Sequence, residues 1–291
     1  MSCDNETNRQ DFYTSIDADI ALGGKKPTSC FVSIRRDFRK CAYPMCGGYF
    51  IQTINSNSEQ VYVATVAFES NQPINKSVVL ESYGKSVIVN GYTRSSSQRG
   101  YKEFVVKTAH VSMEYEGIGE AKGNFYFFKS TGIMCIKAPC PSTSATELNT
   151  GNSVIVSSFS EPYNEHVHRF DGSWAISRVY DEDGSGHAIV QMVPNQQASE
   201  FTITRIYIQV PDPIKPCPKV TRKCPKGQVD LFDRDTNRCL VFRECAKPGV
   251  CILSIPLCQE KWRLHSYPSL QNGCNNYYCD PDFTTPAQQI K

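Results

Sequence analysis

The sequence predicts a mainly β protein: two tandem OB-like β-barrel units with a short helix each, plus a small disulfide-rich C-terminal domain. Three observations lead to this prediction. The chain of 291 residues contains an internal repeat, its apolar segments alternate in the manner of strands, and eight of its 14 cysteines crowd between Cys217 and Cys279. A chain of this length suits two or three domains better than one.

The repeat is visible in two cysteine motifs. Cys41–Cys46 and Cys135–Cys140 share the spacing C-x4-C with a proline inside, at an offset of 94 residues. The same offset relates two further pairs of residues around these motifs, Phe31 with Phe125 and Asn55 with Asn149. Self-similarity at this period predicts tandem domains rather than a solenoid of short repeats.

The predicted elements begin with strands and a helix. Segments rich in β-branched and aromatic residues favour strands at 31–35, 48–54 and 61–68 of the first repeat. A change to helical spacing, with a serine that could cap the first turn, predicts a short helix in each copy, within 76–84 and 173–180.

Two more strands close each repeat. We expect them at 86–91 and 103–107 in the first copy, and at 187–192 and 200–207 in the second. Three strands, a helix and two strands is the element order of an OB-like five-stranded barrel.

The cysteine-free segment before Cys217 ends in a proline-rich stretch, 211–216, which predicts a stiff, extended linker and a domain boundary. In the region after it, disulfide bridges would replace the hydrophobic core that so short a segment lacks. The predicted division is an N-terminal arm at 1–28, repeat 1 at 29–122, repeat 2 at 123–212, an eight-cysteine domain at 213–285 and a flexible tail at 286–291.

Composition argues against two classes of partner. Lys and Arg total 31 against 29 Asp and Glu, without a long run of one sign to follow a phosphate backbone, so we expect no nucleic acid. No apolar segment approaches the roughly 20 residues that cross a bilayer, so we expect no membrane insertion.

An even number of cysteines without the usual zinc-knuckle spacing predicts disulfides and a secreted, extracellular protein. We expect local bridges Cys41–Cys46 and Cys135–Cys140 in preference to cross-repeat pairing, and a bridge from Cys3 to Cys30. Zinc held by both C-x4-C motifs is the alternative, but it leaves the other cysteines unexplained. No bridge should join these six to the remaining eight, whose pairing stays open: Cys217, Cys224, Cys239, Cys245, Cys251, Cys258, Cys274 and Cys279.

The N-terminus lacks the basic and apolar regions of a secretory signal. Either a signal was removed and Met1 added, or the protein is cytosolic; the cysteine content favours the first. Two sequons make Asn5 and Asn75 candidate glycosylation sites.

Two segments resemble known families. Arg35-Arg-Asp-Phe-Arg-Lys-Cys-Ala-Tyr-Pro-Met-Cys-Gly-Gly-Tyr-Phe50, with Gly132-Ile-Met-Cys-Ile-Lys-Ala-Pro-Cys-Pro-Ser142, is similar to an uncharacterised domain family of secreted bacterial proteins, sometimes found beside small inhibitor-like modules. The resemblance spans roughly 29–211 and implies no activity.

The segment from Cys224 to Cys245, which begins Cys-Pro-Lys-Gly-Gln-Val-Asp, resembles the closing half of a trypsin-inhibitor-like cysteine-rich domain. That family has more cysteines than the eight found here, and it does not share the pattern that continues from Cys251 to Cys279. The resemblance therefore implies an inhibitor class but no residue roles.

Catalysis, cofactors and metals are not predicted. None of the five histidines has a catalytic-triad or zinc-protease spacing, and no cysteine is left over as a nucleophile. His166 and His168 would share one face of a strand, with Glu165 as the nearest third ligand, but we expect an exposed loop pair. The acidic segments 181–186 and 233–237 alternate oxygen ligands as calcium loops do, yet both lack the distant glutamate and are predicted turns.

The leading hypothesis is a secreted, non-enzymatic protease inhibitor that acts through the eight-cysteine domain. A disulfide scaffold holds an exposed loop rigid, so that little ordering entropy is lost on binding. Arg222 and Lys223, just before Cys224, are the inhibitory-loop candidates, because they offer a basic side chain to a trypsin-like pocket. The competing interpretation is an ordinary basic, solvent-exposed loop.

Two other classes of function remain. An extracellular binding or adhesion module would present repeated faces, with Tyr43, Tyr49, Tyr163 and Trp174 as platforms for sugars. A structural matrix component is the other class, and the high density of disulfides is the feature that favours it. The expected partner is accordingly an extracellular protein, with a protease as the first candidate, or a glycan.

Overall fold

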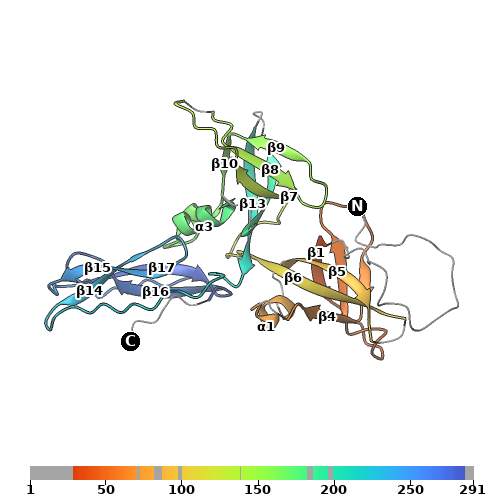
Figure 1. The fold of residues 1–291 in the computed structure, drawn as a ribbon, viewed down its shortest axis with the longest axis horizontal. Coiled ribbons are helices and arrows are strands. Elements are labelled where there is room, and N and C mark those ends of the chain that lie inside the picture. Colours follow the sequence, from red (N-terminus) through yellow and green to blue (C-terminus); the bar gives the residue numbers. More distant parts are fainter. Residues whose placement is uncertain are drawn as a thin grey trace, which may run out of the picture. The chain divides into compact units, whose positions relative to one another are not determined.

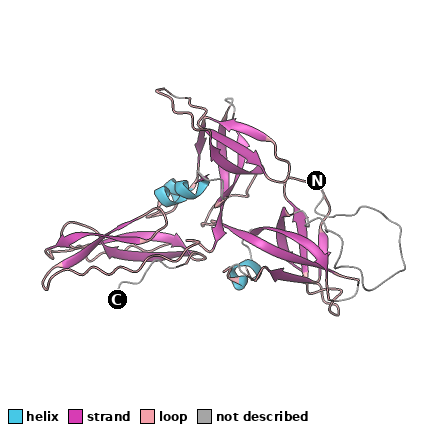
Figure 2. Cartoon of the chain, in the orientation of Figure 1, coloured by secondary structure: helices cyan, strands magenta, loops and turns pink. Residues whose placement is uncertain are grey.

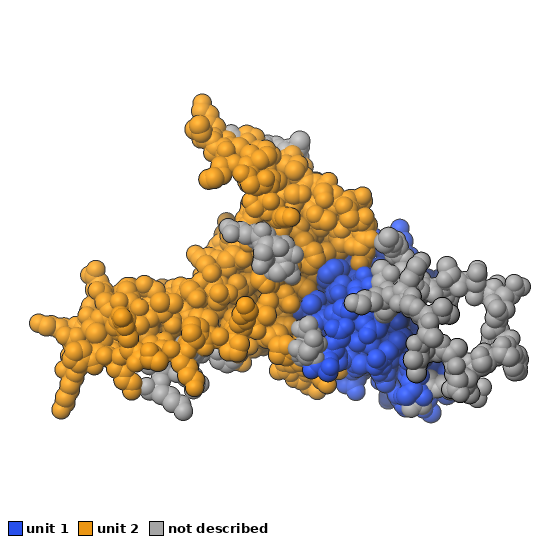
Figure 3. All heavy atoms as spheres, viewed as in Figure 1, with its two compact units in different colours: residues 1–72, 88–109 blue, residues 73–87, 110–291 orange. Residues whose placement is uncertain are grey.

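The computed structural model describes residues 29–70, 73–81, 87–97, 100–137, 139–181, 186–195 and 199–285. Strands make up 44% and helices 7%, so the predicted mainly β class is correct (Figure 1, Figure 2). The chain divides into two compact units, coloured separately in Figure 3: residues 1–72 with 88–109, and residues 73–87 with 110–291. No helix in the described ranges is long and apolar enough to cross a membrane.

The first unit contains most of repeat 1. Its strands are β1 (Cys30–Arg36), β2 (Tyr49–Thr53), β3 (Val61–Val63), β4 (Thr65–Phe68), nearly all of β5 (Val87–Ser95) and most of β6 (Lys102–Ser112). β1 pairs antiparallel with β2 and with β5, β2 pairs antiparallel with β3, and β4 pairs parallel with β6. The side chains that form its core are each at most 4% exposed: Val32, Ile51, Val63, Val89, Phe104 and Val106.

The second unit contains α1 (Lys76–Leu80), the end of β6, repeat 2 and the C-terminal region. Repeat 2 consists of β7 (Asn124–Ser130), β8 (Thr143–Glu147), β9 (Ser153–Val156), β10 (Ser158–Ser160), α2 (Tyr163–His166), α3 (Gly172–Val179), β11 (Tyr180–Asp181), β12 (Ala188–Pro194) and β13 (Glu200–Val210). β7 pairs antiparallel with β8 and with β12, β8 pairs antiparallel with β9, and β10 pairs parallel with β13. These partners and directions repeat those of the first copy.

Two details of the repeat have a physical explanation. Asn55 and Asn149, the asparagines at the shared offset, both have positive φ, 54° and 64°; asparagine tolerates this left-handed conformation better than most residues. The strand that follows is broken once in each copy, at Ala64 and at Ser157, whose backbone N–H groups donate to Lys102 O (2.9 Å) and Ser199 O (2.8 Å). The break lets the chain leave an antiparallel partner and join a parallel one.

Both predicted helices exist, but their caps differ from the predicted serines. Asn75 caps α1 by accepting a hydrogen bond from Ser77 N, and Asp171 caps α3 by accepting one from Trp174 N (3.0 Å). Carboxylate and amide oxygens accept from these first-turn N–H groups as well as a serine hydroxyl does. In the first copy the described helix ends at Leu80.

The C-terminal region consists of two four-cysteine modules. Module 1 places β14 (Val229–Arg234) and β15 (Leu240–Ala246) in one hairpin, and module 2 places β16 (Trp262–Pro268) and β17 (Asn275–Pro281) in another. The bridges follow one pattern: Cys217–Cys239 with Cys224–Cys245, then Cys251–Cys274 with Cys258–Cys279. Each module thus ties an extended segment, C-x6-C, to its own hairpin by first-to-third and second-to-fourth bridges.

Local bridges also close both C-x4-C motifs, Cys41–Cys46 and Cys135–Cys140, as the spacing predicts. No bridge between described cysteines crosses from this group to the C-terminal eight, and none of the described cysteines is free. Cys3 lies outside the described residues, and so does the predicted Cys3–Cys30 bridge.

The proline-rich stretch 211–216 differs from the predicted extended spacer in its first half, which is not exposed. Asp212 is only 2% exposed, and residues of module 2, Trp262 and Cys279, belong to the same buried cluster as Trp174 and Ile206 of repeat 2. Proline restricts the backbone whether or not it is solvated, so composition alone did not reveal that Asp212 is buried, while residues 214–216 are exposed.

Substitution of Tyr163 tests the packing of the buried core of the second unit. Tyr163 is fully buried, donates to Met113 O (3.1 Å) and accepts from Ile206 N (3.0 Å). Tyr163→Phe leaves both backbone groups unsatisfied, and we expect the free energy of unfolding to fall by about 1–3 kcal/mol. Denaturant titration measures it, with Tyr43→Phe as the control because that ring is 54% exposed. Equal stability of the two variants would contradict the assignment.

His110 predicts a pH dependence. Burial lowers its pKa to about 4, whereas a histidine in the unfolded chain titrates near 6.5. The unfolded state therefore binds more protons between these values, and stability falls by up to about 3 kcal/mol as the pH drops from about 6.5 to about 4. His110→Gln, which keeps a donor for Gly186 O, should remove most of this slope in unfolding titrations across that range. An unchanged slope would show that another group carries it.

Candidate functional site

Two exposed loops, each held at both ends by disulfides, are the candidate site. We call residues 218–223, between Cys217 and Cys224, the basic loop, and residues 252–257, between Cys251 and Cys258, the apolar loop. Each bridged cysteine at a loop end is joined to the hairpin of its own module. The loops therefore keep their ends in place without secondary structure of their own.

The basic loop is anchored along one side. Val220 packs against the small cluster of Phe232, Leu240 and Tyr267, which joins the two hairpins. The backbone N–H of Cys224 donates to Asp230 Oδ1 (2.6 Å). These contacts hold the loop against β14 and leave its other side in solvent.

The predicted inhibitory residues, Arg222 and Lys223, both lie on the exposed side of the basic loop. They differ in their surroundings, because the Arg222 guanidinium lies 5.9 Å from the centre of the Phe242 ring. Such a cation–π contact at an exposed site is weak, about 0.5–1 kcal/mol. Arg222 is thus lightly held and can leave its ring for a partner.

The apolar loop exposes aliphatic side chains to an unusual degree. The relative exposures are 87% for Ile252, 92% for Leu253, 65% for Ile255 and 87% for Leu257. A cavity of about 750 Å³ lies beside the loop and is lined also by Leu270, Tyr277, His168 and Arg169. Contiguous apolar surface on a folded protein usually marks an interaction site.

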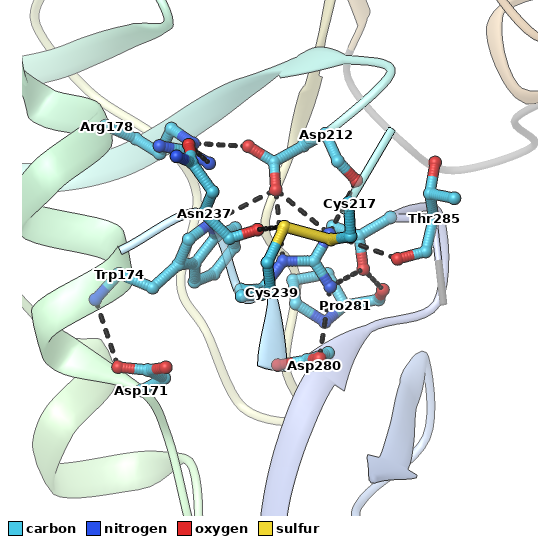
Figure 4. Close-up of polar contacts among 12 residues, drawn as sticks. Asp171, Trp174, Arg178, Asp212, Cys217, Asn237, Cys239, Asp280, Pro281 and Thr285 are labelled. Carbon is cyan, nitrogen blue, oxygen red and sulfur yellow. Dashed lines mark hydrogen bonds and ion pairs between the residues drawn. A yellow bond between two sulfur atoms is a disulfide. The ribbon is translucent and has the colours of Figure 1, made fainter. Parts of the chain in front are cut away.

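A buried ionic network fixes module 1 to repeat 2, and Asp212 is its centre (Figure 4). Asp212 Oδ1 accepts from Trp174 Nε1 (3.1 Å) and from Arg238 Nε (3.0 Å). Asp212 Oδ2 accepts from Arg178 Nε of α3. Arg178 also reaches module 1, where its Nη2 donates to Asn237 Oδ1 (3.1 Å).

Arg238 extends the network to module 2. Its side chain is 0% exposed and donates through Nη1 to Asp280 Oδ2 (3.1 Å) and Thr284 Oγ1 (3.0 Å). Asp280 Oδ1 accepts from Arg234 Nη2 (2.6 Å), and Arg234 Nε lies 2.9 Å from Asp171 Oδ2. Three arginines thus face three aspartates, so the buried charge is balanced.

The network changes the acidity of Asp280 and His265. Burial raises the pKa of the Asp280 carboxyl, but Arg234 and Arg238 more than offset this, so the pKa lies below its usual range. Burial lowers the pKa of His265, although the nearby Asp280 carboxylate opposes the shift. Both shifts favour the ion-paired network with a neutral imidazole beside it at neutral pH.

The C-x4-C loop of repeat 1 is a second exposed feature. The Asp37 carboxylate accepts from Arg39 Nη2 (2.9 Å) and from Gly47 N (3.3 Å), and the Arg39 side chain lies over the ring of Phe50. Hydrogen bonding to Arg39 holds the pKa of Asp37 below its usual value, against the opposing effect of burial. The ordered loop exposes Tyr43 and Met45 by more than half.

The remaining predicted features have clear outcomes. His166 ends α2 rather than lying in a strand; its Nδ1 is 2.8 Å from Pro162 O and its ring stacks on Tyr115. His166 and His168 are both exposed, as predicted. Tyr163 and Trp174 are at most 1% exposed, so they cannot serve as platforms for sugars.

The acidic segment 233–237 begins in β14 and continues, from Asp235, into the turn that the composition predicts. Asp235 Oδ1 accepts from Asn237 N and Cys239 N, both at 2.8 Å. Most of the other acidic segment, 182–185, lies outside the described residues. Within the described ranges, no group of three His, Cys, Asp or Glu is placed to hold a metal ion. Asn75 is exposed at the start of α1, and Asn5 lies outside the described residues.

The fold and the site define a class: a mainly β protein with a disulfide-rich C-terminal region. Residues 30–162 match the family described as Domain of unknown function (DUF6748). The chain is 34% identical over 254 residues to an uncharacterised protein of Dictyostelium discoideum, with 86% of each chain covered. It therefore belongs to the same protein family as that relative. No solved structure matches.

Sequence analysis missed both the network and the second loop. Asp212, Arg178 and Arg238 come from segments far apart in the chain, and no local pattern marks them as partners. The second module was detectable, because the two C-x6-C spacings are 34 residues apart. That offset, read with the aliphatic residues between Cys251 and Cys258, is the signal that could have identified the apolar loop.

The network predicts a large effect of one substitution. Arg238→Ala leaves Asp212 and Asp280 buried with fewer cationic partners, and breaking a buried pair in this way costs about 3–5 kcal/mol. We expect a loss of that size in the free energy of unfolding, together with cleavage near 211–216 in limited proteolysis. The control is Arg243→Ala, because Arg243 pairs with Asp233 at the surface, where an ion pair contributes about 0–1 kcal/mol. Similar losses in both variants would refute the special role of Arg238.

Proposed function

We propose that the protein is a secreted, non-enzymatic protease inhibitor that acts through its eight-cysteine region, residues 213–285. The observation that supports this most directly is the basic loop, which carries exposed Arg222 and Lys223 between two cysteines that are both bridged to one hairpin. The partner that fits such a loop is a trypsin-like protease, because its primary pocket accepts a basic side chain.

Rigidity is the physical basis of the proposal. An inhibitor must occupy a protease cleft without losing much conformational entropy, and disulfides at both loop ends reduce that loss. Val220 packed on the hairpin and the Cys224–Asp230 hydrogen bond restrict the loop further. The resemblance of 224–245 to a trypsin-inhibitor-like domain agrees with the same function.

We infer that each repeat is an OB-like unit in which the third strand is broken in two. The support is the pairing: the third strand joins the second antiparallel on one side of its break and the last strand in parallel on the other. The described strands form no closed barrel, so the proposal concerns the element order, three strands, a helix and two strands, which is that of a partly open OB-like unit. In this proposal repeat 2 is the platform to which the inhibitory modules are attached.

Secretion is part of the proposal. Six disulfides among the described residues are typical of a protein from an oxidising compartment. Exposed Asn75 caps α1 through Oδ1, which leaves its amide nitrogen as the atom to which a glycan would be attached.

A binding or adhesion module is the second candidate function. The observation in its favour is the ordered Cys41–Cys46 loop, which presents Tyr43 and Met45 to solvent. Its counterpart in repeat 2 exposes Met134 by 92% and Ile136 completely. A glycan array and a protease panel separate the two functions.

The test is the inhibition constant of the full oxidised protein against trypsin-like proteases. Replacing Arg222 and Lys223 together by alanine should weaken inhibition by about 30-fold or more, because a truncated anchor residue commonly costs about 2–4 kcal/mol. Reduction of the disulfides should abolish inhibition, since the loop then loses its fixed conformation.

The matched control replaces Lys226 and Lys247, two exposed lysines outside the basic loop, by alanine. This variant removes the same charge and should inhibit like the unchanged protein. Inhibition that is insensitive to Arg222 and Lys223, or simple digestion of the protein, would contradict the assignment.

A further inference from the structure

We propose that the apolar loop is a second inhibitory site, specific for serine proteases with an apolar primary pocket, and that Leu253 is the side chain that enters the pocket. The inference rests on the proposed function, because it assigns the same mode of action to the second module. It adds a partner class that the basic loop cannot serve.

The two loops are equivalent in construction. Each contains six residues between cysteines, and each pair of cysteines is bridged to its own hairpin in the same first-to-third and second-to-fourth order. A scaffold that presents the basic loop thus presents the apolar loop in the same way. The bridging is the same and the side chains differ, and side chains that enter a pocket decide which protease is bound.

The chemistry of the loop selects the pocket. No residue from Pro248 to Cys258 carries a charge, so the loop complements a pocket without a buried carboxylate. Exposure of 92% at Leu253 leaves its whole side chain available for burial. Pro256 restricts the backbone on one side of the loop centre and Cys251 on the other, which lowers the entropy lost on binding.

Leu253 is the best-placed anchor among the aliphatic residues. Ile252 is β-branched and adjoins the bridged Cys251, and Leu257 is restricted on both sides, by Pro256 and by the bridged Cys258. Ile255 lies nearer the loop centre, but it precedes Pro256, which restricts its backbone, and it is only 65% exposed. Leu253 is 92% exposed and is followed by small, exposed Ser254. The bond presented to the protease is therefore Leu253–Ser254.

Cleavage of this bond would not release the pieces. Hydrolysis adds one water, forming a carboxylate on Leu253 and an amine on Ser254. The two bridges from Cys251 and Cys258 would keep both new ends on the β16–β17 hairpin. A clipped chain would remain bound, and the amine would remain beside the acyl group from which it left.

A membrane surface fits the loop less well. Interfacial segments usually combine apolar residues with adjacent Lys or Arg that attract anionic lipids. Arg169 is the one Lys or Arg among the described residues that line the cavity beside the loop, and the nearest basic residues in sequence, Lys247 and Lys261, lie outside the bridged loop. A second copy of the chain would need an uncharged complementary face, and sedimentation tests that outcome.

The experiment measures inhibition constants of the full oxidised protein against chymotrypsin-, elastase- and trypsin-like enzymes, for the unchanged protein and for Leu253→Lys. We expect Leu253→Lys to weaken inhibition of the apolar-pocket enzymes by about 100-fold or more and to strengthen inhibition of trypsin-like enzymes. Ile155→Lys is the control, since it places the same charge at an exposed aliphatic residue of β9 and should change neither constant.

The outcomes separate this inference from the proposed function. Inhibition of trypsin-like enzymes alone supports the proposed function and overturns the second site, whereas inhibition of neither class overturns both. Replacing Arg222 and Lys223 by alanine should leave inhibition of the apolar-pocket enzymes intact. Self-association or binding to uncharged phosphatidylcholine vesicles that Leu253→Lys abolishes, without any inhibition, would assign the loop to another partner and overturn the inference.

Discussion

Asp212 and the arginines around it are the interaction on which the arrangement of the second unit depends. A carboxylate this deeply buried is stable only when it is paired, and its partners come from α3 of repeat 2 and from the turn between β14 and β15. Arg238 also forms a buried ion pair with Asp280, which ties module 2 to the same network. None of these segments can move away without leaving a charge unpaired. The hairpins therefore keep a fixed orientation on repeat 2, and the two exposed loops keep theirs.

Disulfides stabilise each module, whereas the ionic network attaches the modules to repeat 2. Each module is too short to build a large core of its own, so its two bridges limit the unfolded chain while its hairpin shapes the loop. The bridges lie within the modules and do not attach them to repeat 2. That attachment comes from Trp262, which packs in the core of repeat 2 and donates through Nε1 to Glu114 O (2.7 Å), and from the Asp212 network.

The sequence supports the parts of the fold that have local or periodic signals. The offset between the C-x4-C motifs predicts both local bridges, and Asn55 and Asn149 recur because each copy turns through a left-handed residue. The burial of Asp212 in the proline-rich stretch was unpredictable, because its partners lie 34 residues upstream and 26 residues downstream. Composition shows that the stretch is rich in proline, but it does not show which distant residues pair with Asp212. Exposure of Leu253 was also beyond the sequence, since an aliphatic run is ordinarily read as core.

The two modules use their aliphatic residues differently, and this explains why the apolar loop is exposed. In module 1, Val220 of the loop completes the small cluster with Phe232 and Leu240. In module 2, Trp262 and Leu264 of the hairpin and the bridged Cys258 instead pack against the core of repeat 2. Because repeat 2 supplies that core, the loop of module 2 has no structural need to turn Leu253 inward. Its exposed side chains are thus free for recognition, which is the condition that our proposal for this loop requires.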